Sequence, residues 1–180
     1  TNATENETQR VTRTLEDNDH PANPFGYLYD YNAYLYGGRT VRWGNTSPTV
    51  YGVPAGYWRN AVDRWSKMSF EYKDSGTTDI RVIGFVSGLG SKCAEASWTT
   101  YGYYQLHTCE IILNAELPES ACGTWADTLT HEIGHCIGFF NHTSESGVMY
   151  STGGHTITKP VKGMVDLLYS IGVGTNVLPY

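Results

Sequence analysis

Hydrophobic positions recur with a helical period in three stretches of the chain. The first begins near Pro54, a residue that the first turn of a helix tolerates, and the others cover about 124–137 and 161–171. Thr124 can cap the second helix, and Gly138 stands where that helix should end. The apolar face of the first helix is made of Trp58, Ala61, Val62, Trp65 and Met68.

Other stretches alternate between polar and apolar residues or form a compact apolar run, as strands do. Such patterns occupy 40–43, 69–72, 79–83, 98–106 and 110–113. Because one helix is followed by several strands, we expect a mixed sheet with a helix packed against it. The predicted fold class is therefore α/β, in the α+β sense.

The composition favours a folded domain and excludes two classes of partner. Hydrophobic residues make up 40% of the 180 residues, which is enough for a core. Residues 1–24 are polar and predict an extended N-terminal arm, so that residues 25–180 form a single domain, expected to be a monomer. A net charge of −6 without a Lys/Arg cluster argues against nucleic acid as a partner. No apolar run reaches the roughly 18–20 residues that cross a bilayer, so a membrane is not expected either.

The cysteines predict a disulfide-bonded, extracellular protein. An even count of four, outside any CxxC motif, fits two disulfides in an oxidising compartment. A chain with only 17% charged residues and 14 tyrosines favours the same secreted location. Three pairings are possible, and we prefer the pairing of neighbours in the chain, Cys93 with Cys109 and Cys122 with Cys136. Four free buried thiols in a cytosolic protein are the alternative.

The candidate chemistry lies in the run His131-Glu132-Ile133-Gly134-His135. On a helix, His131 and His135 project from the same side one turn apart, so their imidazoles can share one Zn²⁺ at about 2.0–2.1 Å. A bare match to this pattern can also be a helix with two surface histidines. Here the opposite face of the helix is apolar and is made of Trp125, Leu129, Ile133 and Cys136.

Glu132 is the candidate general base. It lies beside His131 but is angularly offset, so its carboxylate can contact a zinc-bound water rather than the zinc. Zinc lowers the pKa of such a water to about 7, and the carboxylate can take its proton and pass it to a leaving amine. This pattern predicts hydrolysis of peptide bonds by a metal-activated water.

The longer run HEIGHCIGFFNH, at 131–142, resembles the metzincin zinc-metallopeptidase signature, and Gly147-Val148-Met149-Tyr150 is similar to the methionine turn of that family. The residues of the motif most closely resemble those of the bacterial HEIGH-type metallopeptidases. The order of the predicted elements resembles the matrixins. The resemblance extends over most of residues 40–172.

The resemblance implies a metzincin-like catalytic domain: a twisted mixed sheet, a backing helix, the zinc helix and a small C-terminal lobe. A protein or peptide substrate would lie across the cleft between the lobes. Met149 would form an apolar floor beneath the histidines without binding the metal. The tyrosines between the glycine-rich loop and the last strand would shape substrate subsites or simply pack, namely Tyr101, Tyr103 and Tyr104.

The third zinc ligand departs from the family pattern, which places it three residues after the glycine. Asn141 occupies that position, and His142 follows one residue later. An unchanged spacing to Met149 favours the Asn141 amide oxygen, whereas imidazole is the stronger zinc ligand. We predict His142 as the ligand, because a loop can accommodate one extra residue, and keep Asn141 as the alternative.

The sequence thus predicts a zinc-dependent endopeptidase. A zinc hydrolase with a downstream glutamate ligand is disfavoured, because Glu145 follows the motif too closely and no later glutamate exists. A secreted binding domain, or an inactive homologue, that retains a structural zinc is the remaining alternative. Glu132 argues against it, because a structural site needs no such carboxylate. His155 is interpreted as a solvated loop histidine near the primed side of the cleft.

Overall fold

The computed structural model describes residues 25–52, 55–74, 76–144 and 146–177, with the side chains of 55–58 excepted. The predicted arm, residues 1–24, and Pro54 lie outside the described residues, as does the side chain of Trp58. None of the described helices is long and apolar enough to cross a membrane.

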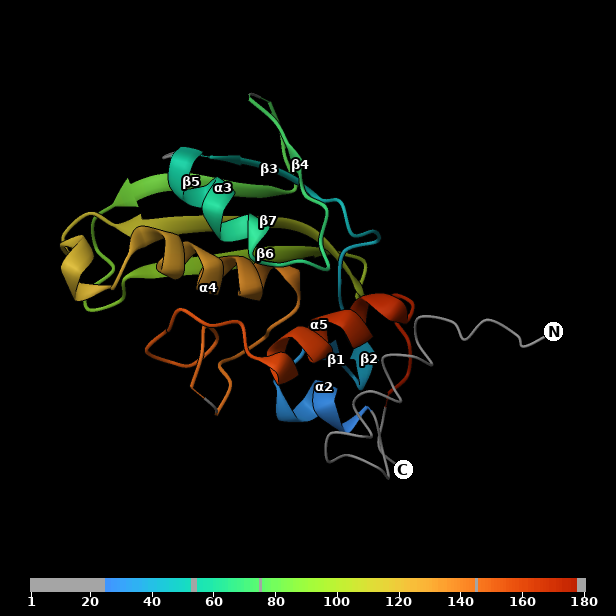
Figure 1. Cartoon of the computed structure of the whole chain (residues 1–180). Coiled ribbons are helices and arrows are strands. Elements are labelled where there is room, and N and C mark those ends of the chain that lie inside the picture. Colours follow the sequence, from blue (N-terminus) through green and yellow to red (C-terminus); the bar gives the residue numbers. More distant parts are fainter. Residues whose placement is uncertain (1–24, 53–54, 75, 145, 178–180) are drawn as a thin grey trace.

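A five-stranded mixed sheet forms the larger part of the molecule (Figure 1). The strands lie in the order β4-β3-β5-β7-β6, with β6 antiparallel to β7 and the other pairs parallel. The predicted mixed sheet is therefore confirmed, although the stretch 98–106 spans the turn between two strands. The strands are β3 (Thr49–Gly52), β4 (Glu71–Tyr72), β5 (Ile80–Val86), β6 (Ala94–Tyr101) and β7 (Gln105–Asn114).

Two helices cover one face of this sheet. Along β5, Ile80 and Val82 are buried while Arg81 and Ile83 are exposed, so only one face is packed. The helices α3 (Ala55–Asp63) and α4 (Trp125–Ile137) pack on the sheet and against each other (Figure 1). Helix α3 is shorter than predicted, but Trp65 and Met68 are still buried in the turn that follows it.

Helix α4 begins and ends at the predicted residues. The Thr124 hydroxyl accepts a hydrogen bond from the Asp127 backbone N–H at 3.1 Å, which satisfies one of the free donors of the first turn. Gly138 ends the helix with φ of 157°, and a Cβ there would lie 2.4 Å from Leu168 Cδ2. A residue with a side chain at Gly138 would therefore require the buried Leu168 side chain to shift.

The smaller lobe is built from both ends of the described chain. Helices α2 (Gly26–Asp30) and α5 (Lys159–Ser170) pack together beside a small hairpin of β1 (Leu35–Tyr36) and β2 (Arg39–Thr40) (Figure 1). The Thr40 hydroxyl donates to the Gly172 carbonyl at 2.7 Å, which joins the two ends. The sequence predicted a small lobe formed by the C-terminal part of the chain alone. The predicted strand at 40–43 contributes Thr40 alone to β2, whereas Arg42 forms a separate parallel bridge with Gln105 at the start of β7.

The disulfides correct the predicted pairing: Cys93 is bonded to Cys122, and Cys109 to Cys136. In the β6–β7 pair, Cys109 lies opposite Trp98, five residues along the strand from Cys93. That separation is about 16 Å at 3.3 Å per residue, far beyond what a disulfide can bridge. Neighbours in sequence are therefore kept apart by the hairpin, and Cys93 and Cys109 each bond to a cysteine that follows β7.

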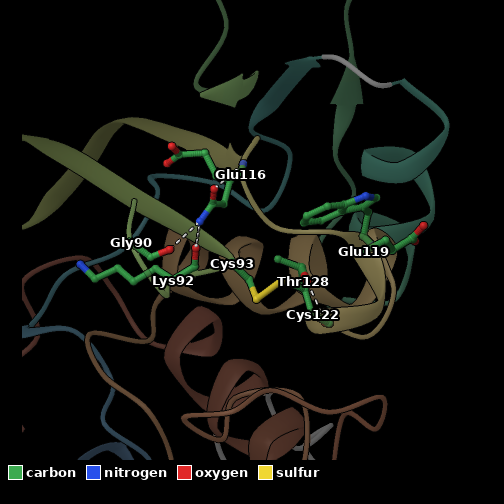
Figure 2. The surroundings of a disulfide bond; sticks show 9 residues. Gly90, Lys92, Cys93, Glu116, Glu119, Cys122 and Thr128 are labelled. Carbon is green, nitrogen blue, oxygen red and sulfur yellow. Dashed lines mark hydrogen bonds between the residues drawn. A yellow bond between two sulfur atoms is a disulfide. The ribbon is translucent and has the colours of Figure 1, made fainter. Parts of the chain in front are cut away.

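The Cys93–Cys122 bond joins two loops at the end of the sheet (Figure 2). The buried Asn114 side chain holds the first loop by donating to the carbonyls of Gly90 and Lys92 at 3.0 and 2.8 Å. The second loop contains a short 3-10 helix, Glu119–Ala121, and its Cys122 carbonyl accepts from Thr128 of α4. The start of β6 and the start of α4 are thereby joined covalently.

Candidate metal centre

Three histidines converge on one point. One ring nitrogen from each of His131, His135 and His142 lies within 4.8 Å of the other two. The Nε2 atoms of His131 and His135 are 3.2 Å apart. Two nitrogens at about 2.0–2.1 Å from a tetrahedral zinc would lie roughly 3.4 Å apart, so this donor set and spacing fit such an ion.

Backbone carbonyls orient the two helical rings. His131 Nδ1 lies 2.5 Å from the Val148 carbonyl, and His135 Nδ1 lies 2.9 Å from the Phe139 carbonyl. Because a carbonyl can only accept, each Nδ1 carries the hydrogen and each Nε2 keeps its lone pair for a metal.

Burial keeps these imidazoles neutral. It lowers the pKa of His135 to about 4, with the neighbouring His131 adding to the effect. The pKa values of His131 and His142 are also lowered, again mainly by burial. Neutral imidazole is the form that binds a metal, so no ring must lose a proton near pH 7.

Glu132 is buried beside the cluster, with 7% of its surface exposed. Burial, together with the charge of Glu95, raises the pKa of its carboxyl to about 8, although Lys92 and a hydrogen bond with the Ala96 backbone act in the opposite direction. A cation bound at the histidines would lower this pKa. The carboxyl is therefore in a setting suited to proton transfer.

A cleft of about 740 Å³ opens over the histidines and Glu132. One wall is the start of β6, the edge strand of the sheet, and another is the loop 151–155. This size lies within the range of ordinary ligand sites. Trp98 adds an aromatic surface, with its ring stacked 6.4 Å from the His135 ring.

The structure brings His142, rather than Asn141, to the cluster. The His142 ring centroid lies 5.0 and 5.2 Å from those of His131 and His135. Asn141 is exposed, and its side-chain oxygen accepts a hydrogen bond from the His142 N–H at 2.8 Å. The one-residue extension of the loop is thus accommodated, and metal binding through His142 stays a prediction.

Met149 is fully buried against α4, at the turn between His131 and His135. A Cβ added at Gly134 would lie 2.3 Å from the Met149 sulfur and 2.9 Å from Trp65 Cζ2. Glycine at this position therefore lets the methionine approach the backbone of α4, as expected for an apolar floor.

Gly134→Ala is expected to lower the free energy of unfolding by about 1–2 kcal/mol, although alanine favours helix by up to about 1 kcal/mol. The reason is overpacking, because Met149 and Trp65 are buried and have little room to move. Chemical denaturation of the metal-free protein measures this difference. An unchanged or increased stability would contradict the close packing of Met149 on the helix.

An ion-pair cluster around the buried Asp127 at the start of α4 was not predicted. Asp127 accepts from Arg64 Nη1 and pairs with His155 Nδ1, both at 2.5 Å. Burial alone would raise the pKa of Asp127, but the hydrogen bonds from Arg64 and Thr124 and the charge of His155 outweigh it, and the pKa is lowered. His155 is 78% exposed, as predicted, yet it joins the loop 151–155 to α4. No local signal could reveal this pairing, because the residues are far apart in the chain.

The tyrosines that were predicted to shape subsites or to pack lie away from the histidine cluster. Tyr103 stacks on Tyr36 at 5.5 Å between centroids, and Tyr104 packs beside both. Tyr101 is 73% exposed at the end of β6. Since none of the three lines the cleft, packing and surface positions describe them better than subsites do.

The described part of the chain therefore contains a histidine cluster that could hold a metal ion, with a buried carboxyl and an open cleft beside it. Comparison of the sequence with models of known protein families and with curated proteins finds no match.

Proposed function

We propose that the chain is a zinc-dependent endopeptidase of the metzincin type. The observation that carries the proposal is the convergence of His131, His135 and His142 beside the buried Glu132. Three neutral imidazoles are a typical ligand set of catalytic zinc, which keeps its fourth position for water or substrate. The sequence motif at 131–142, the histidine cluster and the buried Met149 together support the metzincin assignment.

Each residue has a distinct task in this proposal. The three histidines hold the metal, which when bound supplies a Lewis acid that activates water and polarises the substrate carbonyl. Glu132 accepts the proton of the attacking water and delivers it to the leaving amine. The hydrogen bond with the Ala96 backbone keeps the Glu132 carboxyl against β6 while it does so.

The proposed substrate is an extended protein or peptide segment. β6 lies at the edge of the sheet, and its residues 94–96 line the cleft beside Glu132. An edge strand presents free backbone groups that can pair with an extended chain. The two disulfides support a secreted protein that meets such substrates in an oxidising environment.

A secreted binding domain or inactive homologue with a structural zinc is the alternative. Structural zinc is usually enclosed by four protein ligands. Among the described residues the cluster has three, and a cleft opens over it. These features favour catalysis over a purely structural role.

Chelation tests the proposal. The purified protein is expected to contain one zinc per chain and to cleave a denatured protein substrate. Removal of zinc by a chelator should abolish cleavage, and stoichiometric zinc should restore it. Zinc content and product formation are measured on the same samples. A protein that holds zinc through the three histidines but cleaves no denatured substrate would favour the binding-domain alternative.

A further inference from the structure

The third histidine of the cluster lies in a loop and not on the helix that carries the other two. His131 and His135 are carried by α4, whereas His142 follows Gly138 in the irregular stretch 139–142. Within this stretch the Phe140 N–H donates to the carbonyl of Asn32, at 2.8 Å. The position of His142 therefore depends on a segment more than a hundred residues earlier in the chain.

Asn32 contacts the loop at two points. Its carbonyl accepts from the Phe140 N–H, and its side-chain Nδ2 donates to the carbonyl of His142 itself at 2.6 Å. One residue thus holds the loop on both sides of Asn141. The backbone of the third histidine cannot shift along the loop without losing one of these bonds.

The backbone of Asn32 suits this double contact. Its φ is 53°, and among the described residues it is the one non-glycine residue with positive φ. Asparagine tolerates this left-handed conformation better than most residues. Such backbone conformations persist where the surroundings require them, and they cluster at functional sites. Here the conformation places the carbonyl and the amide of Asn32 on the same loop.

The neighbours of Asn32 support the start of the loop but do not reach His142. Ala33 forms an antiparallel bridge with Phe139, and the Tyr34 N–H donates to the Gly138 carbonyl at 2.6 Å. These are backbone contacts, which most side chains would preserve. The Asn32 amide is the side-chain group that extends the support to the third histidine.

We propose that Asn32 is a positioning residue that sets the register of the loop, so that His142 and not Asn141 faces the metal. This inference rests on the proposed zinc centre. In the observed register the Asn141 oxygen is already engaged by the His142 N–H. Loss of the Asn32 donor would leave the carbonyl of the third histidine unsupported and the ring free to leave the cluster.

Two substitutions at Asn32 distinguish the contribution of its side-chain amide from that of its backbone. Asn32→Asp keeps the size and replaces the donor by an oxygen that repels the His142 carbonyl. Asn32→Gly keeps the left-handed backbone and the bond to Phe140 but removes the side chain. Both are expected to weaken zinc affinity by about 10–100-fold, the usual effect of losing a partner that orients a ligand. Asn60→Asp, at an exposed position of α3, is the matched control and should bind zinc like the wild type.

The measurements are zinc affinity by competition with a chromophoric chelator, and the visible spectrum of the Co²⁺-substituted protein. The wild type should show the spectrum of a three-imidazole site, and both Asn32 variants an altered one. In a His142→Ala background, Asn32→Asp should weaken zinc no further, because its effect passes through that histidine.

Three results would be decisive against the inference. Equal zinc affinity and Co²⁺ spectra in the wild type and both variants would overturn the positioning role alone. If Asn32→Asp weakened zinc binding as much in the His142→Ala background as in the wild type, the positioning role would also be overturned. Such a result would indicate a general effect on the fold. A wild-type protein that binds neither ion would contradict the metal centre itself, and the role of Asn32 with it.

Discussion

Glu132→Gln is expected to lower kcat for peptide hydrolysis by about 10²–10⁴-fold, the usual contribution of a general base. Glutamine has nearly the same size and still offers an oxygen to the Ala96 backbone, but it cannot take a proton from water. The histidines are unchanged, so the protein should still contain one zinc per chain. The measurement is kcat on a denatured substrate, together with zinc content by atomic absorption.

The matched control for this substitution is Glu110→Gln. Glu110 has the same charge but lies exposed in β7, and it does not line the cleft. This variant should retain wild-type kcat. If Glu132→Gln held its zinc and kept activity within a few-fold of the wild type, the proposed role of the carboxyl would be wrong.

Removal of the buried disulfide should have a large effect on stability. Cys109 and Cys136 are fully buried, with a sequence separation of 27. Loss of the cross-link by a double substitution to alanine should lower the free energy of unfolding by about 3–4 kcal/mol from chain entropy alone. The melting temperature of a domain of this size should then fall by roughly 7–14 °C. Calorimetry of the oxidised proteins measures the difference.

The second disulfide provides the control for the position of the bond. Cys93–Cys122 has a separation of 29, so its chain-entropy effect should be similar. Cys136, however, lies next to His135 on α4, and its bond joins the turn that carries His135 to the sheet. Only the loss of Cys109–Cys136 should therefore also weaken zinc binding. Equal zinc affinity in the two double variants would show that the buried bond does not position the metal centre.

Local patterns were sufficient for the helix at the centre of the site. A helix turns about 100° per residue, so four residues bring His131 and His135 to the same side whatever the rest of the fold does. The cap at Thr124 and the end at Gly138 also depend on residues within one turn. The alternation at 79–83 likewise identified strand β5, because a strand reverses its side chains at every residue, and the compact apolar run at 110–113 identified β7.

Pairings between distant segments could not be predicted in the same way. The preferred disulfides were wrong because the β6–β7 hairpin separates Cys93 from Cys109, and the sequence did not reveal where that hairpin turns. The contact of His155 with Asp127 depends on how separate elements pack. So does the small lobe, in which the two ends of the described part of the chain come together. Neither leaves a periodic signal in the residues concerned.

The position of His142 shows which features the sequence determines by itself and which depend on the tertiary structure. The chain alone indicated two helical ligands, a neighbouring carboxylate and a choice between Asn141 and His142, because helical geometry and ligand chemistry act over a few residues. That choice depended on the folded molecule, where Asn32 holds both sides of the loop and His142 turns toward the cluster. A loop has no fixed rotation per residue, so its register comes from the distant segment that pairs with it.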